Sequence, residues 1–167
     1  MKIEIVKGSL LEAQADLIVN PANSAGVMGG GVAGAIRRAA GSEVEAEAIA
    51  KAPIPVGGAA LTSGGKSRFK GILHAPTMTR PAEAIPVENV RKAVRAALAL
   101  SDAKGAKILA FPGMGTGVGR VSPRSAAEAM IEEMLAFQSK SIEKIILVDV
   151  NDEMTAAWRT ALSKQKR

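Results

Sequence analysis

The sequence of 167 residues contains no cysteine, no tyrosine and a single histidine, His74. Without cysteine, the chain lacks a disulfide framework, a thiolate ligand for a metal ion and a thiol nucleophile. One histidine leaves little from which to build a zinc site or a histidine-based catalytic triad. We therefore expect no bound metal and no cofactor, and much of the usual enzyme repertoire is excluded.

Aromatic residues make up only 2% of the chain, so the stacking platforms that single-strand nucleic-acid binders use are missing. The 22 Lys and Arg residues nevertheless outnumber the 16 Asp and Glu residues, and the formal net charge of +6 favours anionic partners. Most basic residues are spread along the chain, with one short cluster at Lys164, Lys166 and Arg167. A basic nucleic-acid-binding module stays an alternative interpretation, and it would bind nucleic acid with a steep dependence on salt.

No apolar run approaches the roughly 18 residues of a membrane span, and the opening MKIEIVKG alternates as a strand does. We expect a cytoplasmic protein that makes no contact with membranes. The length favours one domain over residues 1–167, which we expect to be a monomer. Hydrophobic residues at 47% and charged residues at 23% are typical of a globular chain.

Short apolar runs alternate with longer segments of helical period, which is typical of an α/β layer architecture. This pattern predicts strands over residues 2–6, 17–19, 59–62, 71–75, 107–111 and 144–148. It predicts helices over residues 31–40, from 42 to a stop before 53, over 87–104, from 123 onward and from about 152. The stretch from Pro76 to Pro86 is expected to be a surface loop.

The second of these helices carries a local start signal. Ser42 with Glu45 three residues on has the spacing of a capping box, in which each side chain bonds to the backbone at the helix start. Ala46, Ile49 and Ala50 are expected to supply its buried face.

Glycines are concentrated in two places, at residues 26–34 and 113–119. Each cluster follows a predicted strand and precedes a predicted helix, so each should lie at the carboxyl edge of the sheet, where α/β proteins bind ligands. Glycines let the backbone approach a ligand closely, and backbone amides with a helix N-terminus form a receptor for phosphate. Two facing loops of this kind suit a diphosphate.

Familiar motifs fit less well. Gly29, Gly31 and Gly34 have the GxGxxG spacing of a dinucleotide fold, but a long loop separates them from the strand and Ile54 stands where an acid is needed. A Rossmann-type nucleotide-dependent enzyme is therefore only an alternative. His74 lies within an apolar strand without an acidic neighbour in sequence, which predicts a hydrogen-bonded core residue.

Two asparagines, Asn20 and Asn23, follow the second predicted strand in the run VNPAN. They could be turn residues, but Asn23 also offers a donor and acceptors to a ligand hydroxyl, as a sugar requires. Because the first glycine cluster follows directly, the combination predicts a pocket for a nucleotide sugar.

The runs DLIVNPAN, GGGVAGAIRRAAG, ILHAPT and ILAFPGMGTGVGRVSP, in this order, resemble the successive signatures of the macrodomain, an ADP-ribose-binding α/β module. The resemblance covers nearly the whole chain. It implies a three-layer α/β/α sandwich with a mixed central sheet of six or seven strands and with ADP-ribose across its crest. It also implies ADP-ribosylated proteins or nucleic acids, or O-acetyl-ADP-ribose, as partners.

Carried over position by position, the resemblance places the distal ribose at Asn23, the phosphates at two glycine loops and adenine beside Leu10, Val150 and Asn151. Asn23 would also be the catalytic residue of a metal-independent ADP-ribosyl hydrolase. The implied ligand-binding residues are Ser9, Leu10, Asn23, Gly29, Gly30, Gly31, Val32, Gly115, Thr116, Gly117, Val118, Gly119, Val150 and Asn151.

Two positions depart from the family pattern. Ser9 stands where the family usually has an acid that reads the adenine amino group, so we expect weaker adenine recognition. Ala33 stands where the hydrolytic branch most often has an Asp that activates water. Without that carboxylate we expect ADP-ribose binding with weak or no hydrolysis.

Overall fold

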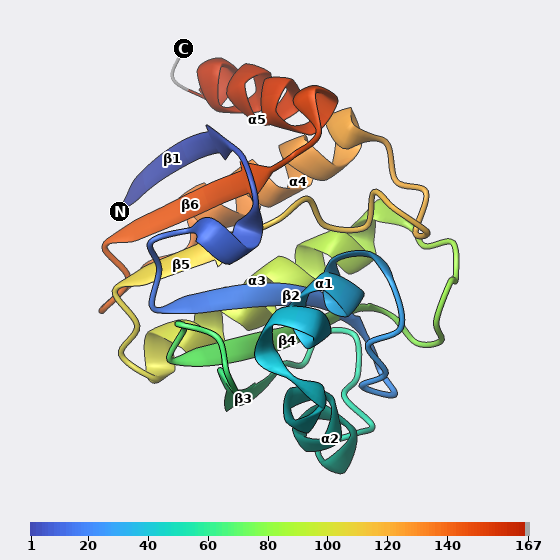
Figure 1. Ribbon diagram of the computed structural model, residues 1–167. Coiled ribbons are helices and arrows are strands. Elements are labelled where there is room, and N and C mark those ends of the chain that lie inside the picture. The colour runs from blue at the N-terminus through green and yellow to red at the C-terminus, as the bar shows by residue number, and fades with distance from the viewer. Residues whose placement is uncertain (166–167) are drawn as a thin grey trace.

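The computed structural model describes residues 1–165, and Lys166 and Arg167 of the basic cluster lie outside them. These residues form one mixed sheet of six strands in the order β1-β6-β5-β2-β4-β3 (Figure 1). All neighbouring strands are parallel except β3, which is antiparallel to β4. The strands are β1 Lys2–Lys7, β2 Leu17–Asn23, β3 Ala60–Ser63, β4 Gly71–Met78, β5 Ile108–Phe111 and β6 Lys144–Asp149.

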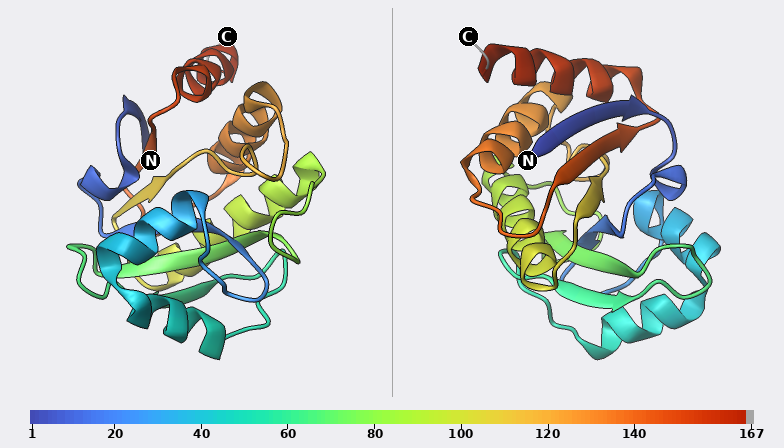
Figure 2. Two further views of the ribbon diagram at one scale, coloured as in Figure 1. Left: turned by 45° about the vertical axis from the view of Figure 1, so that its right-hand side comes forward. Right: turned by 90° about the vertical axis from the view of Figure 1, so that its left-hand side faces the viewer.

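Helices cover both faces of this sheet, as Figure 2 shows from two sides. One face carries α1 and α2, and the other carries α3, α4 and α5. The predicted three-layer α/β/α sandwich with a mixed six-stranded sheet is therefore confirmed. The helices are α1 Gly31–Ala40, α2 Ser42–Ala50, α3 Val87–Ala103, α4 Pro123–Ala136 and α5 Asp152–Gln165. Within the described residues, no helix combines the length and the apolarity that a membrane span needs.

Two apolar cores lie on either side of the sheet. The larger one packs α3, α4 and α5 against the sheet and includes the fully buried Trp158 and Phe111. The smaller one joins α1 to the opposite face through Ile36, Ile18 and Ile72. β4 is covered by helices on both faces and is buried at all eight positions, which is why apolar residues predominate in it beside the buried His74 and Thr77.

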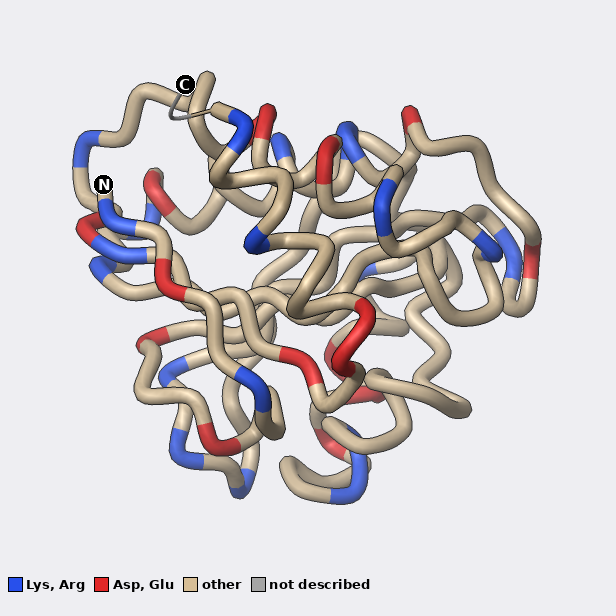
Figure 3. Tube along the Cα trace, turned by 90° about the horizontal axis from the view of Figure 1, so that it is seen from above, with Lys and Arg blue, Asp and Glu red and all other residues tan. Residues whose placement is uncertain are grey.

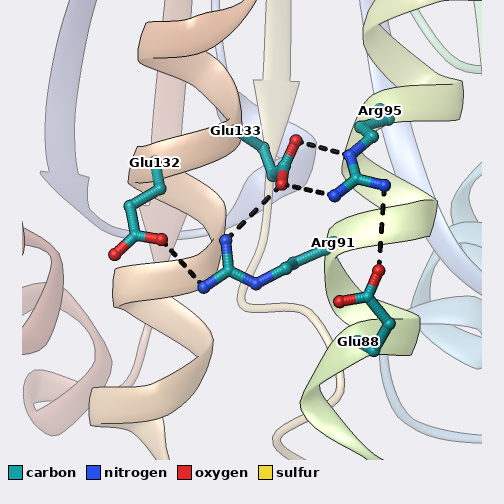
Figure 4. A network of polar contacts seen from close by, with 5 residues as sticks. All are labelled: Glu88, Arg91, Arg95, Glu132 and Glu133. Carbon is teal, nitrogen blue, oxygen red and sulfur yellow. Dashed lines mark hydrogen bonds and ion pairs between the residues drawn. The ribbon is translucent and has the colours of Figure 1, made fainter.

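An ion-pair network joins the exposed sides of α3 and α4 (Figure 4). Arg95 donates to Glu133 through two nitrogens, at 2.6 and 2.8 Å, and also pairs with Glu88 at 3.7 Å. Arg91 bridges Glu132 and Glu133 at 2.8 and 3.5 Å. These arginines therefore join two helices, and both are already paired with carboxylates.

The predicted start of α2 at Ser42 is confirmed, but the predicted capping box is wrong. Gly41, at φ +100°, is both the C-cap of α1 and the N-cap of α2, and no side chain caps α2. Ser42 is already helical, so it cannot act as the N-cap of a capping box, and Glu45 bonds elsewhere. The predicted buried face is wrong too: Ala46, Ile49 and Ala50 are exposed, while Val44 and Ala48 are buried. This narrow stripe packs on the turns at Gly26 and Gly65.

Two strands, β2 and β4, extend further than predicted by three residues or more. β2 continues through Asn23, so Asn20 and Asn23 belong to the strand and do not follow it. β4 continues through Met78, which shortens the expected loop to residues 79–86. Pro76 is tolerated within β4 because β3 pairs only as far as His74, so beyond it one side of β4 needs no hydrogen bond.

His74 is a hydrogen-bonded core residue, as predicted. It is fully buried, and its Nδ1 accepts a hydrogen bond from Asn20 Nδ2 at 3.1 Å. Its Nε2 lies 3.0 Å from Thr62 Oγ1, so the neutral ring donates there. Burial lowers the pKa of His74 from 6.5 to about 4, although the charge of Glu47 acts in the opposite direction.

This buried imidazole predicts a pH dependence of stability. Between pH 6.5 and 4 the unfolded chain binds a proton at His74 that the folded chain does not. The free energy of unfolding is therefore undiminished by this group above pH 6.5, and it falls as the pH is lowered toward 4. We expect the free energy of unfolding to fall by about 2 kcal/mol between pH 7 and pH 5, measured by urea denaturation. His74→Gln should remove this slope; an equal slope in the variant would assign it to other groups.

Candidate ligand site at the carboxyl edge of the sheet

The parallel strands bring the predicted site residues to one edge of the sheet. The carboxyl ends of β1, β6, β5, β2 and β4 lead directly into Gly8, Val150, Pro112, Ser24 and Thr79. The first glycine loop leaves β2 and the second leaves β5, and these strands are hydrogen-bonded neighbours. Asn23, the last residue of β2, and Gly117, in the second loop, therefore lie at the same edge, as the phosphate-receptor hypothesis requires.

A cavity of about 210 Å³ opens between this edge and α1. Its walls come from the end of β1, the first turns of α1, the residue after β5 and the end of β6. Five of the predicted ligand residues line it, namely Ser9, Leu10, Gly31, Val32 and Val150. Gly8, Leu11, Ala35, Ile36, Pro112, Val148 and Asp149 line it as well. Ala35, Ile36 and Pro112 lie in the family signatures, whereas Gly8, Leu11, Val148 and Asp149 lie outside them and only the fold brings them to the cavity.

Ser9 and Asp149 are the two polar side chains among the described residues that line this cavity. Ser9 is the N-cap of a short 3-10 turn at Leu10–Glu12, and its Oγ accepts a hydrogen bond from Leu11 N at 3.2 Å. Asp149 accepts from Gly113 N at 3.0 Å and from Asn151 N at 2.9 Å. The carboxylate thus fixes the start of the second glycine loop to the end of β6.

Asn23 has its side chain turned into the first loop. Its Oδ1 accepts from Ala25 N at 3.1 Å and from Val27 N at 3.3 Å, and its Nδ2 donates to Val27 O at 2.9 Å. Both acceptor positions of the amide oxygen are therefore used, and one N–H is left for a ligand. The Asn23 side chain thus holds the conformation of the first loop, apart from any contact with a ligand.

The first loop ends in three glycines that face open space. A Cβ built on Gly29, Gly30 or Gly31 would meet no heavy atom within 4 Å. Gly30 is the N-cap of α1, so the amides of the first helical turn have no partner within the helix. A ligand can approach the backbone closely here, and the positive end of the helix favours an anion.

In the second loop, Gly115 and Gly119 are packed against neighbouring atoms, whereas Gly117 faces outward. Gly115, at φ +77°, lies against Val90, and a Cβ on it would come within 2.7 Å of Val90 Cγ2. A Cβ on Gly119 would come within 2.6 Å of Gly115 O. Gly117 is exposed with no neighbour within 4 Å of an added Cβ. Thr116 and Val118 flank it, and Val118 is 57% exposed.

The remaining predicted residues lie at the end of β6. Val150 is 71% exposed and lines the cavity. Asn151 is exposed, and its Oδ1 accepts from Met154 N at 3.0 Å, which caps the start of α5. The described part of the chain holds no group of three or more His, Asp or Glu side chains arranged for a metal ion.

Comparison with known proteins identifies this fold. A family model described as Macro domain matches residues 19–130, which include the first loop, β4, β5 and the second loop. The chain belongs to the macrodomain family. This macrodomain is 58% identical to an uncharacterized protein of Aquifex aeolicus over 97% of this chain and 98% of that protein. It is 31% identical to an O-acetyl-ADP-ribose deacetylase of Escherichia fergusonii, over 98% of this chain and 97% of that enzyme.

Solved macrodomains have the same fold. A macrodomain of Oceanobacillus iheyensis with ADP superimposes with a TM-score of 0.87 at 25% identity, covering 98% of this chain and 91% of that one. A Trypanosoma brucei macrodomain in complex with ADP-ribose gives 0.85 at 24% identity, covering 96% and 68%. The macrodomain resemblance of the sequence is therefore confirmed, and the Rossmann alternative is wrong.

Proposed function

We propose that this macrodomain binds ADP-ribose, and through it ADP-ribosylated proteins or nucleic acids or O-acetyl-ADP-ribose. The observation that carries the proposal is the place of the apolar cavity at the N-terminus of α1, on the same sheet edge as both glycine loops. An apolar, base-sized cavity beside an anion receptor matches the chemistry of a nucleotide. The deacetylase relative and the ADP and ADP-ribose complexes of other macrodomains support this assignment.

Three groups of residues would each contact one part of ADP-ribose. Adenine would enter the cavity at Ser9, Leu10 and Val150, whose walls are mostly apolar. The diphosphate would lie between the open amides of Gly29 to Val32 and the loop from Gly115 to Gly119. The distal ribose would reach Asn23, whose one remaining N–H can donate to a hydroxyl.

Hydrolysis is expected to be weak or absent. Residues 24–34, which form the first loop and the first turn of α1, contain no Asp, Glu or His, so they supply no general base. Positioning of the ribose by Asn23 can still contribute to a slow reaction. Incubation with ADP-ribosylated protein and nucleic acid, followed by detection of free ADP-ribose, measures this activity.

The nucleic-acid alternative has little support in the placement of charge. Figure 3 shows Lys and Arg residues interleaved with Asp and Glu residues along the trace. Several lysines have an acidic partner, among them the exposed Lys7 with Asp152, the exposed Lys70 with Asp16 and the half-buried Lys144 with Glu4. A pocket that binds ADP-ribose should show a shallow dependence on salt, whereas unmodified DNA or RNA should bind weakly.

Calorimetry with ADP-ribose, ADP and adenosine tests the proposal. We expect ADP-ribose to bind best and adenosine to bind at least about 100-fold more weakly, because adenosine lacks the phosphates to which the backbone amides would donate. Titrations of unmodified RNA at two salt concentrations are the comparison for the alternative. Equal affinity for adenosine and ADP-ribose would overturn the diphosphate site.

A further inference from the structure

Glu45 of α2 reaches out of its own helix to the first glycine loop. Its Oε2 accepts a hydrogen bond from Met28 N at 2.7 Å, a contact between residues 17 positions apart. Its Oε1 lies 3.0 Å from Arg37 Nε, on α1. The Glu45 side chain is 18% exposed and that of Arg37 is 48% exposed, so the bond to Met28 is partly buried and the ion pair lies nearer the surface. Charge-assisted hydrogen bonds in such a setting are short and strong.

The bonded amide directly precedes the three open glycines. Met28 has its side chain fully buried, whereas a Cβ on Gly29, Gly30 or Gly31 would meet nothing within 4 Å. The carboxylate therefore holds the last packed residue of the loop, beyond which the backbone is free to meet a ligand. The same helix closes on the loop a second time, since Gly26 lies against the backbone of Ala48.

The negative charge of Glu45 is unusual beside a site proposed to bind an anion. A carboxylate near a diphosphate would repel it, but the Arg37 guanidinium pairs with Glu45 and offsets its charge. Arg37 lies in the last turn of α1, the helix whose first turn offers the open amides. The pair thus connects α1, α2 and the first loop into one unit, and α1 and α2 lie side by side in Figures 1 and 2.

We infer that Glu45, held by Arg37, is a positioning residue that sets the first glycine loop for the diphosphate of the ligand. This inference rests on the proposed function for the identity of the ligand. Glu45 acts on the ligand only through the Met28 amide.

The test compares Glu45→Ala with Glu45→Gln and with Glu43→Ala. Glu45→Ala should weaken ADP-ribose binding about 10- to 30-fold, with a loss that grows from AMP to ADP to ADP-ribose. Glu45→Gln keeps an oxygen that can accept from Met28 N and should stay within about threefold of the wild type. Glu43 is exposed in the first turn of α2, so Glu43→Ala removes the same charge without removing the contact to Met28. If Glu45 acted through charge alone, all three variants would bind ADP-ribose more tightly, which would overturn the inference.

Hydrogen exchange of the ligand-free protein separates this inference from the proposed function. In Glu45→Ala, the amide of Met28 should exchange faster than in the wild type, while Glu43→Ala should leave it unchanged. Unchanged exchange at Met28 in Glu45→Ala would overturn the positioning role whatever the ligand. Faster exchange in a protein whose wild type does not bind ADP-ribose would instead reject the proposed function and keep the contact.

Discussion

Replacing Gly117 by Glu is expected to abolish ADP-ribose binding while the fold remains intact. Gly117 is exposed, and a Cβ on it would meet no heavy atom within 4 Å, so the larger side chain fits without strain. Its carboxylate would face the diphosphate across the second loop. Two like charges about 5 Å apart repel by about 3 kcal/mol at an effective dielectric constant of 20. Calorimetry should show a loss of more than about 100-fold.

Gly117→Gln is the matched control, because it has the same bulk without the charge. It should lose far less affinity than Gly117→Glu, and urea denaturation should give both variants the free energy of unfolding of the wild type within about 0.5 kcal/mol. Gly115 would be a poor choice, since its φ of +77° and the contact with Val90 make any side chain destabilising. Wild-type affinity in Gly117→Glu would place the phosphates elsewhere.

Local patterns predicted the fold because they act within one element or one turn. The strand and helix order followed from apolar periodicity. A serine directly before a proline favours a helix start, and Ser122, before Pro123, caps α4 by accepting a hydrogen bond from Ser125 N. Parallel strands then place the segments that follow them at one edge. That rule alone brought Asn23 and the second glycine loop together.

The contacts between elements could not be predicted in the same way. Ser42 and Glu45 have the spacing of a capping box, yet Glu45 binds Met28 because α2 packs against a loop that precedes it by a whole helix. Asp149 has no motif around it, but β6 ends beside the start of the second loop and the carboxylate joins the two. Tertiary packing decides such partners, and a local pattern carries no information about it.

The same distinction applies to the two asparagines of β2. The sequence treats them alike, as two amides in the run VNPAN. In the structure, Asn20 is 1% exposed and bonds to His74 in the core, whereas Asn23 is 9% exposed and bonds to the first loop. Only Asn23 is therefore placed to affect a ligand, and the pair supplies an experiment with an internal control.

Asn23→Ala is expected to lower both stability and ligand affinity. The variant loses three hydrogen bonds to Ala25 and Val27, which at about 1 kcal/mol each gives a loss of about 3 kcal/mol in the free energy of unfolding. Because those bonds shape the loop that leads to Gly29, ADP-ribose affinity should fall by up to about 100-fold. Any ADP-ribosyl hydrolysis should fall further, since the remaining N–H, which we propose orients the ribose, is lost as well.

Asn20→Ala is the control for loss of stability alone. It removes the hydrogen bond to His74 and should destabilise the core, but it leaves the first loop and its amides as they are. Once both variants are measured at a temperature where each is folded, Asn20→Ala should bind ADP-ribose as the wild type does. If the two alanine variants bind ADP-ribose equally well, Asn23 neither shapes the first loop for the ligand nor contacts the distal ribose, and the chemistry must be sought on other residues.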